Sequence, residues 1–167
     1  MKLRKINSSK DINIVKNFFY DIFWEETDYD LSHFKDSVTG KHDFQRLEYY
    51  IGYENGLPIG ISGIYADNEN ECWLGWFGIR PEHRQKGYAT TMLRLQLDIM
   101  KNYGYNICRL YTNKQINKTA VQLYIKNGFT KDSDYKNHII TMAKPLKGGV
   151  HVPKWQGMMP LGFVPEA

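Results

Sequence analysis

Hydrophobic positions in the first forty residues follow the period of a strand and then the period of a helix. Residues 2 to 7 alternate and predict a strand, and Ser9 or Asp11 is predicted to cap a helix that runs to about Phe23. The apolar face of this helix carries Ile12, Val15, Phe18, Phe19 and Ile22. A second, short helix is predicted through Phe34 to a position near Gly40.

The middle of the chain predicts a hairpin, a buried strand and a long helix. Residues 47 to 53 and 58 to 65 are two strand patterns joined by Asn55-Gly56, a strong hairpin signal. Residues 71 to 79 form an apolar and aromatic run that predicts one buried strand. A helical pattern then extends from Gly87 to about residue 103, and Gly104 is a suitable C-terminal stop.

The last third predicts a strand, a helix and a second hairpin. Residues 107 to 111 are strand-like, Asn117 is predicted to cap a helix that ends at Gly128, and 129 to 132 with 138 to 144 complete the pattern. The order is β-α-α-β-β-β-α-β-α-β-β. We therefore expect an α/β fold of the α+β kind, with a partly antiparallel sheet of about seven strands and helices on both faces.

Composition and length indicate one domain with an additional arm. At 167 residues, with 42% hydrophobic and 24% charged residues, the chain can bury a core of its own. We expect this domain to span residues 1 to 146. Residues 147 to 167 are too apolar to remain in water, and prolines at 153, 160 and 165 disfavour a helix. We expect an extended arm that packs on its own domain or on the neighbouring subunit of a homodimer.

Several classes of partner and location are disfavoured. The net charge is +4, and basic residues are mixed with acidic ones, so we expect no nucleic acid. The apolar stretch from Phe18 to Trp24 contains Asp21 and is too short for a membrane span. Cys72 and Cys108 lie in apolar runs, which indicates buried thiols and a cytoplasmic location. The five histidines show no metal-ligand spacing, so no metal is expected.

The segment from Ile79 to Ala89 joins the aromatic strand to the long helix. The first backbone N–H groups of a helix lack partners within the helix, and its dipole is positive there, so an anion is favoured. Gly87 permits close approach of a ligand, and Ala89 keeps the next position small. The pattern Arg84-x-x-Gly87-x-Ala89 therefore suits a pyrophosphate, although Gly87 could instead mark only a tight turn.

Two motifs in this order resemble those of the GNAT superfamily of acyl-CoA-dependent N-acyltransferases. They are Ile79-x-Pro81-x-x-Arg84-x-x-Gly87-x-Ala89 and Asn117-x-x-Ala120-x-x-Leu123-Tyr124-x-x-x-Gly128-Phe129, and the similarity covers residues 2 to 145. The resemblance implies a GNAT-like, mostly antiparallel sheet, with acetyl-CoA as the cofactor. It places the amides of Gln85, Lys86, Gly87, Tyr88, Ala89 and Thr90 around the pyrophosphate, with Arg84 nearby and Asn117 on the cofactor side.

The same resemblance assigns roles at the reacting end of the cofactor. Pantetheine would lie along the strand that ends at Ile79, and the amide of Phe77 would face the acyl oxygen. Tyr124 matches the residue whose phenol protonates the departing thiolate, although a tyrosine here could also be an ordinary core residue. Asn117 could equally be a plain helix cap.

The group that removes the proton from the acceptor is left open by the sequence. A lysine-like amine has a pKa of about 10.4, so it needs a base at neutral pH. Many relatives carry a carboxylate where this chain has Trp73. Glu71 shares the strand face of Trp73 and could act through a water, or it could be a solvated strand-end residue. Glu26, Asp67 or a chain of waters are the alternatives.

Residues 24 to 30 match the segment that walls the acceptor site in the family. Four carboxylates alternate there with Trp24 and Tyr29. We expect Glu25, Glu26, Asp28 and Trp73 to bind a primary amine, in a small cationic molecule or a lysine side chain, unless the loop is merely solvated. The expected function is N-acetyltransferase, by direct attack in a ternary complex. The alternative is a non-catalytic acyl-CoA-binding sensor or interaction module, which Trp73 and the apolar arm favour.

Overall fold

The computed structural model describes residues 1–23 and 31–163. The predicted substrate residues Glu25, Glu26 and Asp28 lie outside these ranges. The elements are β1 (Lys2–Lys5), α1 (Ser9–Lys16), α2 (Phe19–Ile22), α3 (Ser32–Thr39), β2 (Arg46–Glu54), β3 (Leu57–Ala66), β4 (Glu71–Leu74), β5 (Gly78–Ile79), the 3-10 turn η2 (Pro81–His83), α4 (Tyr88–Asn102), β6 (Ile107–Asn113), α5 (Lys118–Lys126), β7 (Thr130–Asp134) and β8 (Ile139–Pro145).

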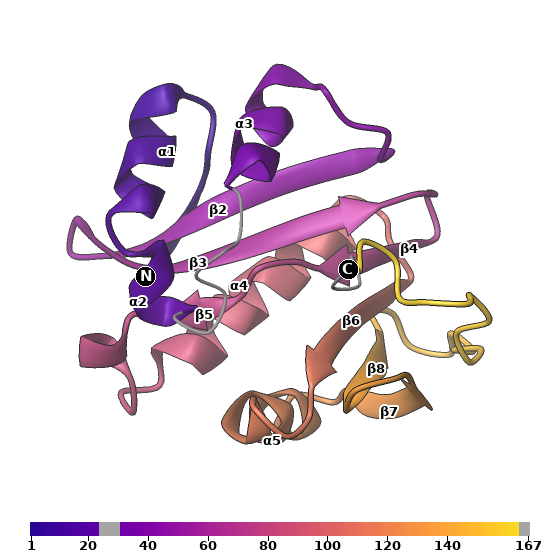
Figure 1. The fold of residues 1–167 in the computed structure, drawn as a ribbon. Coiled ribbons are helices and arrows are strands. Elements are labelled where there is room, and N and C mark those ends of the chain that lie inside the picture. Colours follow the sequence, from indigo (N-terminus) through magenta and orange to yellow (C-terminus); the bar gives the residue numbers. More distant parts are fainter. Residues whose placement is uncertain (24–30, 164–167) are drawn as a thin grey trace.

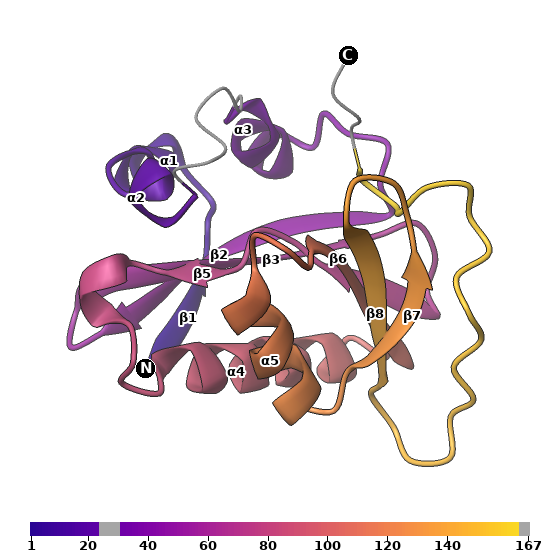
Figure 2. The ribbon, with the colours of Figure 1, turned by 60° about the horizontal axis from the view of Figure 1, so that its bottom comes forward.

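One eight-stranded sheet forms the middle layer (Figure 1). Its order is β1-β2-β3-β4-β6-β8-β7, and β5 pairs with β3 beyond the end of β4. Every pairing is antiparallel except that of β4 with β6, which α4 makes possible by crossing from one strand to the other. Helices α1, α2 and α3 cover one face and α4 and α5 the other, as Figure 2 shows. The predicted mixed fold with helices on both faces is confirmed.

The eighth strand exists because the predicted strand 71–79 is interrupted. Leu74 is paired with Ile64 and Gly78 with Ile61, so the three residues from Gly75 to Phe77 lie opposite the two residues Ser62 and Gly63. This is a bulge, in which Gly75 N–H still bonds to the Gly63 carbonyl at 2.8 Å. The bulge turns neighbouring side chains to opposite faces: Trp76 packs with the cluster under α1 to α3, and Phe77 with the cluster under α4 and α5.

The N-terminal helix differs from its prediction at both ends. Ser8, instead of Ser9 or Asp11, is the N-cap, and its hydroxyl accepts from Asp11 N–H at 3.3 Å. The helix stops at Lys16, and a separate turn, α2, begins at Phe19. Phe18 between them has φ −133°, and this departure lets both Phe18 and Phe19 be buried.

The remaining predicted elements are present with small changes at their ends. Gly40 (φ 77°) terminates α3, Asn55-Gly56 forms the turn between β2 and β3, and Gly104 follows α4 with φ 97°. Asn117 occupies the N-cap position of α5, and Gly128 follows that helix with φ 92°. Cys72 and Cys108 are buried free thiols on paired strands, and burial raises the pKa of the Cys72 thiol well above its usual value.

The arm after β8 runs back over its own sheet, on the same face as α1 to α3 but over the part of that face that these helices do not cover (Figure 2). Trp155 meets the ring of Trp73 edge-on at 5.0 Å, and the Tyr65 hydroxyl donates to the Leu161 carbonyl at 2.6 Å. The arm contains no helix or strand between residues 147 and 163. Within the described ranges, no helix has the length and apolar character needed to cross a membrane.

Candidate active site

Two neighbouring strands separate at the centre of the sheet. The parallel register of β4 and β6 ends at Trp73 and Arg109. Beyond that point β5 follows β3, while the rest of β6 pairs only with β8 on its other side. The bulge from Gly75 to Phe77 therefore faces the second half of β6, and no strand pairing joins the two. Among the described residues, none accepts a hydrogen bond from Phe77 N–H.

The loop before α4 presents a run of unpaired amides. Gln85 (φ 61°) and Gly87 (φ 81°) both have left-handed backbone conformations, and Gly87 is the N-cap of α4. The N–H of Thr91 begins the helical bonding by donating to Gly87 O. In the described part of the chain, no partner is found for the N–H groups of residues 85 to 90. Such a concave set of amides at a helix N-terminus binds anions.

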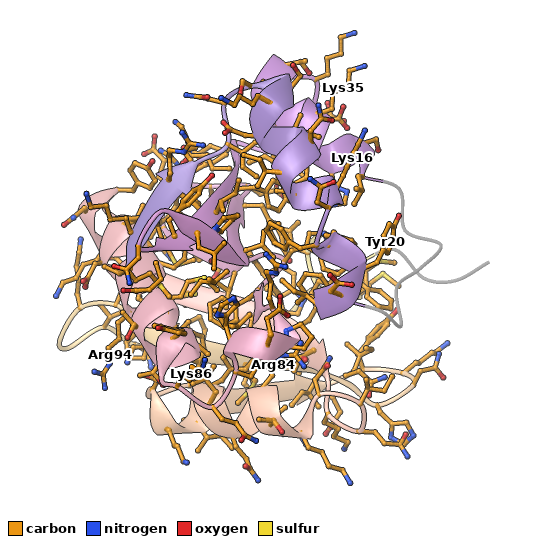
Figure 3. The ribbon with its side chains drawn as sticks, turned by 90° about the vertical axis from the view of Figure 1, so that its left-hand side faces the viewer. Lys16, Tyr20, Lys35, Arg84, Lys86 and Arg94 are labelled. Carbon is orange, nitrogen blue, oxygen red and sulfur yellow. The ribbon has the colours of Figure 1, made fainter. Side chains whose placement is uncertain are left out.

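Arginine and lysine side chains surround this loop. Arg84 Nε donates to the Ile79 carbonyl at 2.9 Å, which ties the loop to the end of β5. Figure 3 shows Arg84, Lys86 and Arg94 on this side of the molecule, close to the start of α4. Tyr88, Ala89 and Thr90 form the first turn of the helix and are half-buried. The structure thus brings the predicted residues 84 to 90 together at one end of the separated strands.

Tyr124 lies on α5, below the bulge. Its ring is buried, and the Phe77 and Phe129 rings lie 6.2 and 5.7 Å from it. Burial raises the pKa of the Tyr124 phenol above its usual value, so the hydroxyl remains protonated at physiological pH. The ring of this proton donor therefore lies beside the ring of Phe77, the residue whose backbone N–H is unpaired among the described residues.

Asn117 does not cap α5 through its side chain, contrary to the sequence prediction. Its Nδ2 instead donates to Thr112 Oγ1 at 3.2 Å, which links the start of α5 to the second half of β6. Asn117 therefore lies at the strand that faces the bulge.

Glu71 and Trp73 lie before the bulge, on the face that carries the arm. Glu71 Oε2 is 2.9 Å from Arg109 Nε, and the same guanidinium contacts Asp132 at 2.5 Å. Arg109 is 1% exposed and also donates to the Pro153 carbonyl of the arm. Trp73 is fully buried, and none of the residues that the structure describes accepts a hydrogen bond from its indole N–H. The signal for this buried ion cluster was available, because Arg109 interrupts an apolar strand.

An aromatic group that sequence reasoning missed lies on the other side of the bulge. The Trp76 ring contacts Phe19 at 5.2 Å, Phe23 at 4.8 Å and His33 at 5.9 Å between centroids. The members come from α2, α3 and the bulge, and their spacing in the sequence carries no common pattern. These four residues are called the aromatic shelf below.

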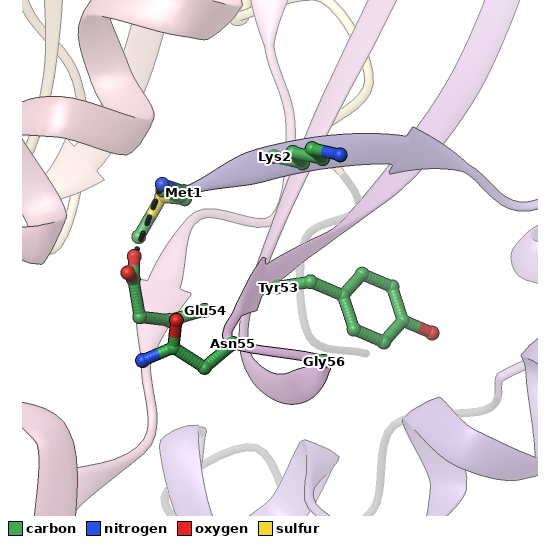
Figure 4. A pocket seen from close by; sticks show the side chains of 6 residues that line it. All are labelled: Met1, Lys2, Tyr53, Glu54, Asn55 and Gly56. Carbon is green, nitrogen blue, oxygen red and sulfur yellow. Dashed lines mark ion pairs between the residues drawn. The ribbon is translucent and has the colours of Figure 1, made fainter.

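A hollow lies elsewhere, between the start of β1 and the turn that joins β2 to β3 (Figure 4). It is lined by Met1, Lys2, Tyr53, Glu54, Asn55 and Gly56. Its main feature is the ion pair of the N-terminal ammonium with Glu54 at 3.1 Å. Since the amide run, the bulge and Tyr124 are not part of its lining, we place the candidate active site at the separated strands.

Together, the unpaired amides, the bulge and the buried tyrosine define an acetyltransferase of the GNAT type. The acetyltransferase (GNAT) family model matches residues 16–129, and the chain belongs to this family. A spermidine N(1)-acetyltransferase from Thermoplasma acidophilum is 29% identical over 106 residues, which cover 56% of this chain and 65% of that relative. The chain is therefore similar to just under two thirds of that protein.

Solved structures share the fold at low sequence identity. The PaiA N-acetyltransferase from Thermoplasma acidophilum, solved with coenzyme A, has a TM-score of 0.64 at 20% identity, covering 87% of this chain and 99% of that one. Aminoglycoside 6'-acetyltransferase type Ii has a TM-score of 0.72 at 13% identity, covering 88% and 98%. These likenesses establish the architecture.

Proposed function

We propose that this protein is an N-acetyltransferase that transfers acetyl from acetyl-CoA to a primary amine of a small cationic acceptor. The proposal is supported mainly by three features that lie in one line. They are the unpaired amides of residues 85 to 90, the bulge that forms no strand pairing with β6, and the phenol of Tyr124 beside Phe77. A pyrophosphate, an extended pantetheine and a thioester need these features in this order.

The cofactor end rests on backbone groups. The amides from Gln85 to Thr90 would hold the pyrophosphate, and Arg84, Lys86 and Arg94 would add positive charge around it. Pantetheine would bond to the strand from the bulge to Ile79 as an added strand. Asn117, which bonds to the facing strand β6, would border this channel. A structural neighbour solved with coenzyme A supports the choice of ligand.

The chemical step is a direct attack in a ternary complex. The neutral amine adds to the thioester carbonyl carbon, and Phe77 N–H stabilises the developing oxyanion. The nitrogen then loses its extra proton to a base, the carbon–sulfur bond breaks, and the leaving thiolate takes a proton from the Tyr124 hydroxyl, which regains one from solvent. The raised pKa of Tyr124 keeps this proton in place until the thiolate forms.

The proposed acceptor is supported by the residue types near α3 and by one similar protein. Glu25, Glu26 and Asp28 precede α3 in the chain, and the aromatic shelf offers ring faces that attract cations. Trp73 is fully buried under Trp155, so the sequence-based expectation that Trp73 contacts the acceptor is not part of this proposal. One similar protein is a spermidine acetyltransferase, which supports a polyamine as the first acceptor to test. Two free thiols support a cytoplasmic location.

A non-catalytic acyl-CoA-binding module is the second candidate. It is favoured by one observation: Trp73 stands where many relatives have a carboxylate, and Trp155 of the arm covers it. Such a module would bind acetyl-CoA but release no thiol when amines are added.

The test is an assay of coenzyme A release with spermidine and other primary amines, combined with calorimetric titration of acetyl-CoA. Tyr124→Phe should lower kcat about 100-fold, because it removes the proton donor, and should leave acetyl-CoA affinity unchanged. Tyr135→Phe is the matched control, since this half-buried tyrosine is not at the bulge. Binding without release from any amine would contradict the transferase and support the module.

A further inference from the structure

A GNAT transferase of cationic amines needs a proton acceptor beside the attacking nitrogen, and the residues before the bulge are engaged elsewhere. Glu71 is ion-paired with the buried Arg109, and the arm lies over that guanidinium. Trp73 offers only an N–H, which cannot take up a proton. Asp67 lies in the exposed turn at the end of β4 farthest from the bulge.

His33 is the ionisable member of the aromatic shelf. Its ring is stacked on Trp76 with an interplanar angle of 21° and a centroid distance of 5.9 Å. Trp76 is the middle residue of the bulge and the direct neighbour of Phe77. The imidazole therefore lies against the face of the bulge opposite to Tyr124.

The two sides of the bulge separate the two proton transfers that the reaction needs. Phe77 points to Tyr124, which can give a proton to the sulfur, whereas Trp76 points to His33. An amine that attacks the thioester from the shelf side would bring its N–H groups to the imidazole. Delivery and removal of protons on opposite faces avoid competition for one group.

The position of His33 in the chain suits this role. It occupies the first turn of α3, which follows directly on residues 24 to 30. Phe34 at 4.6 Å and Tyr49 at 5.5 Å hold the ring from α3 and β2.

We propose that His33 is the catalytic base that removes the proton from the acceptor amine. The inference rests on the proposed transferase function and adds a residue to its mechanism. The amine lone pair forms the new carbon–nitrogen bond and the carbon–sulfur bond breaks. The proton lost by nitrogen passes to the imidazole, and the thiolate receives a different proton from Tyr124. After the product leaves, the imidazolium gives its proton to water and the Tyr124 phenolate takes one from water, which restores both groups.

The experiment is kinetic comparison of His33→Ala with the wild-type full chain, using the best amine found in the release assay. At about pH 7 we expect kcat to fall about 100-fold with an unchanged acetyl-CoA KM. The loss should shrink as pH rises to about 9, because more of the amine then loses its proton in solution. Added imidazole should restore part of kcat, since it can occupy the space that the substitution leaves.

The groups that face His33 come from β2, from the bulge and from α3 itself. From β2 the titratable group in ring contact is the phenol of Tyr49. The bulge contributes Trp76, which does not titrate. On α3 itself the neighbouring charged residues are Lys35 and Asp36.

His42→Ala is the matched control. His42 is half-buried and packs on Phe44, as His33 packs on Phe34, but it does not contact the bulge. Its kcat should stay within about threefold of wild type. Equal melting temperatures of both variants would show that the loss in His33→Ala is not a folding defect.

Two outcomes would overturn the assignment of His33. One is a His33→Ala kcat close to wild type at neutral pH. The other is a loss that is independent of pH and is not restored by imidazole, which would indicate a structural role. A wild-type protein that releases no thiol with any amine would instead reject the proposed function itself, so the two failures are distinguishable.

Discussion

At the scale of single residues, the anion-binding loop depends on backbone conformations that most side chains avoid. Gln85 and Gly87 both have positive φ, and a Cβ at Gly87 would meet no atom within 4 Å. The glycine is therefore required for its conformation and for the approach of a ligand, and not for packing within the protein. Loss of this glycine should disturb the amides more than the core.

Gly87→Ala should lower the free energy of unfolding by about 1 kcal/mol and weaken acetyl-CoA binding about tenfold or more. The matched control is Gly56→Ala in the β2–β3 turn, where φ is 79° and space is equally open. Its cost in stability should be similar, without any effect on binding. Denaturant titration and calorimetry measure the two quantities. Equal acetyl-CoA affinity of the two variants would contradict the role of the loop.

The sequence predicted residues whose role depends on the local chain and missed those whose role depends on distant partners. Gly87, Gly104 and Gly128 were identified from turn chemistry alone. The ion cluster of Arg109 joins three strands and the arm, and the His33 contact with Trp76 joins α3 to the bulge. Arg109 within an apolar strand indicates a buried charge, but neither pairing has a fixed spacing along the chain, so the sequence could not identify the partners.

At the scale of elements, a polar network attaches the end of α4 to β2. Glu48 accepts hydrogen bonds from Arg46, Tyr50 and Tyr103, at 2.6, 2.6 and 2.8 Å. Burial alone would raise the pKa of Glu48, but these three donors outweigh it and lower the pKa below its usual value. The network therefore stabilises the fold only while Glu48 is ionised.

The pH dependence follows from this sign. Because the folded pKa of Glu48 is lowered, its contribution is complete above the unfolded value of about 4.3 and is lost as pH falls through the folded value. Glu48→Gln should reduce the free energy of unfolding at neutral pH by about 1 to 3 kcal/mol and flatten its decline in acid.

Denaturant titrations between about pH 3 and about pH 7 would measure the effect. Glu69→Gln, at an exposed position in the β3–β4 turn, is the control and should follow the wild-type curve. A Glu48→Gln curve parallel to that of the wild type would show that Glu48 does not carry the acid dependence.

Element types were predicted correctly where local pattern and burial agree. The hairpin of β2 and β3 and the helix α4 are clear cases, because their turn glycines and apolar periods point the same way. The break between α1 and α2 and the division of the predicted strand 71–79 into β4 and β5 differ from the predicted elements. Both depend on how aromatic residues are buried between the sheet and the helices, and single-chain periodicity contains no record of that packing.

At the scale of the whole molecule, the arm takes the place of a helix on one half of the sheet. Helices α1 to α3 cover one half of this face, over β1 to β3. The arm covers the other half of the same face through Trp155 and Leu161. Arg109 makes a cation–π contact with the Trp155 ring, and Asp132 accepts a hydrogen bond from Trp155 N–H. Trp155 is thus the main anchor of the arm.

Trp155→Ala should lower the free energy of unfolding by about 2 to 4 kcal/mol, because it uncovers Trp73 and the buried ion cluster. Met158→Ala is the control within the arm, since Met158 is 94% exposed, and should have no measurable effect. Chemical denaturation of both variants decides the matter. Equal stability of the two variants would show that the arm is not held by Trp155.

The single parallel pairing in the sheet, between β4 and β6, lies next to the proposed ligand site. Short turns join β2 to β3 and β3 to β4, whereas β4 and β6 meet over three parallel residue pairs with the whole of α4 between them in the chain. Parallel strands cannot be joined by a tight turn, so the pairing of β4 with β6 depends on the α4 crossover. A thioester ligand bound between the bulge and β6 would contact both strands. Ligand binding would therefore stabilise the pairing of β4 with β6, and the two equilibria would be linked.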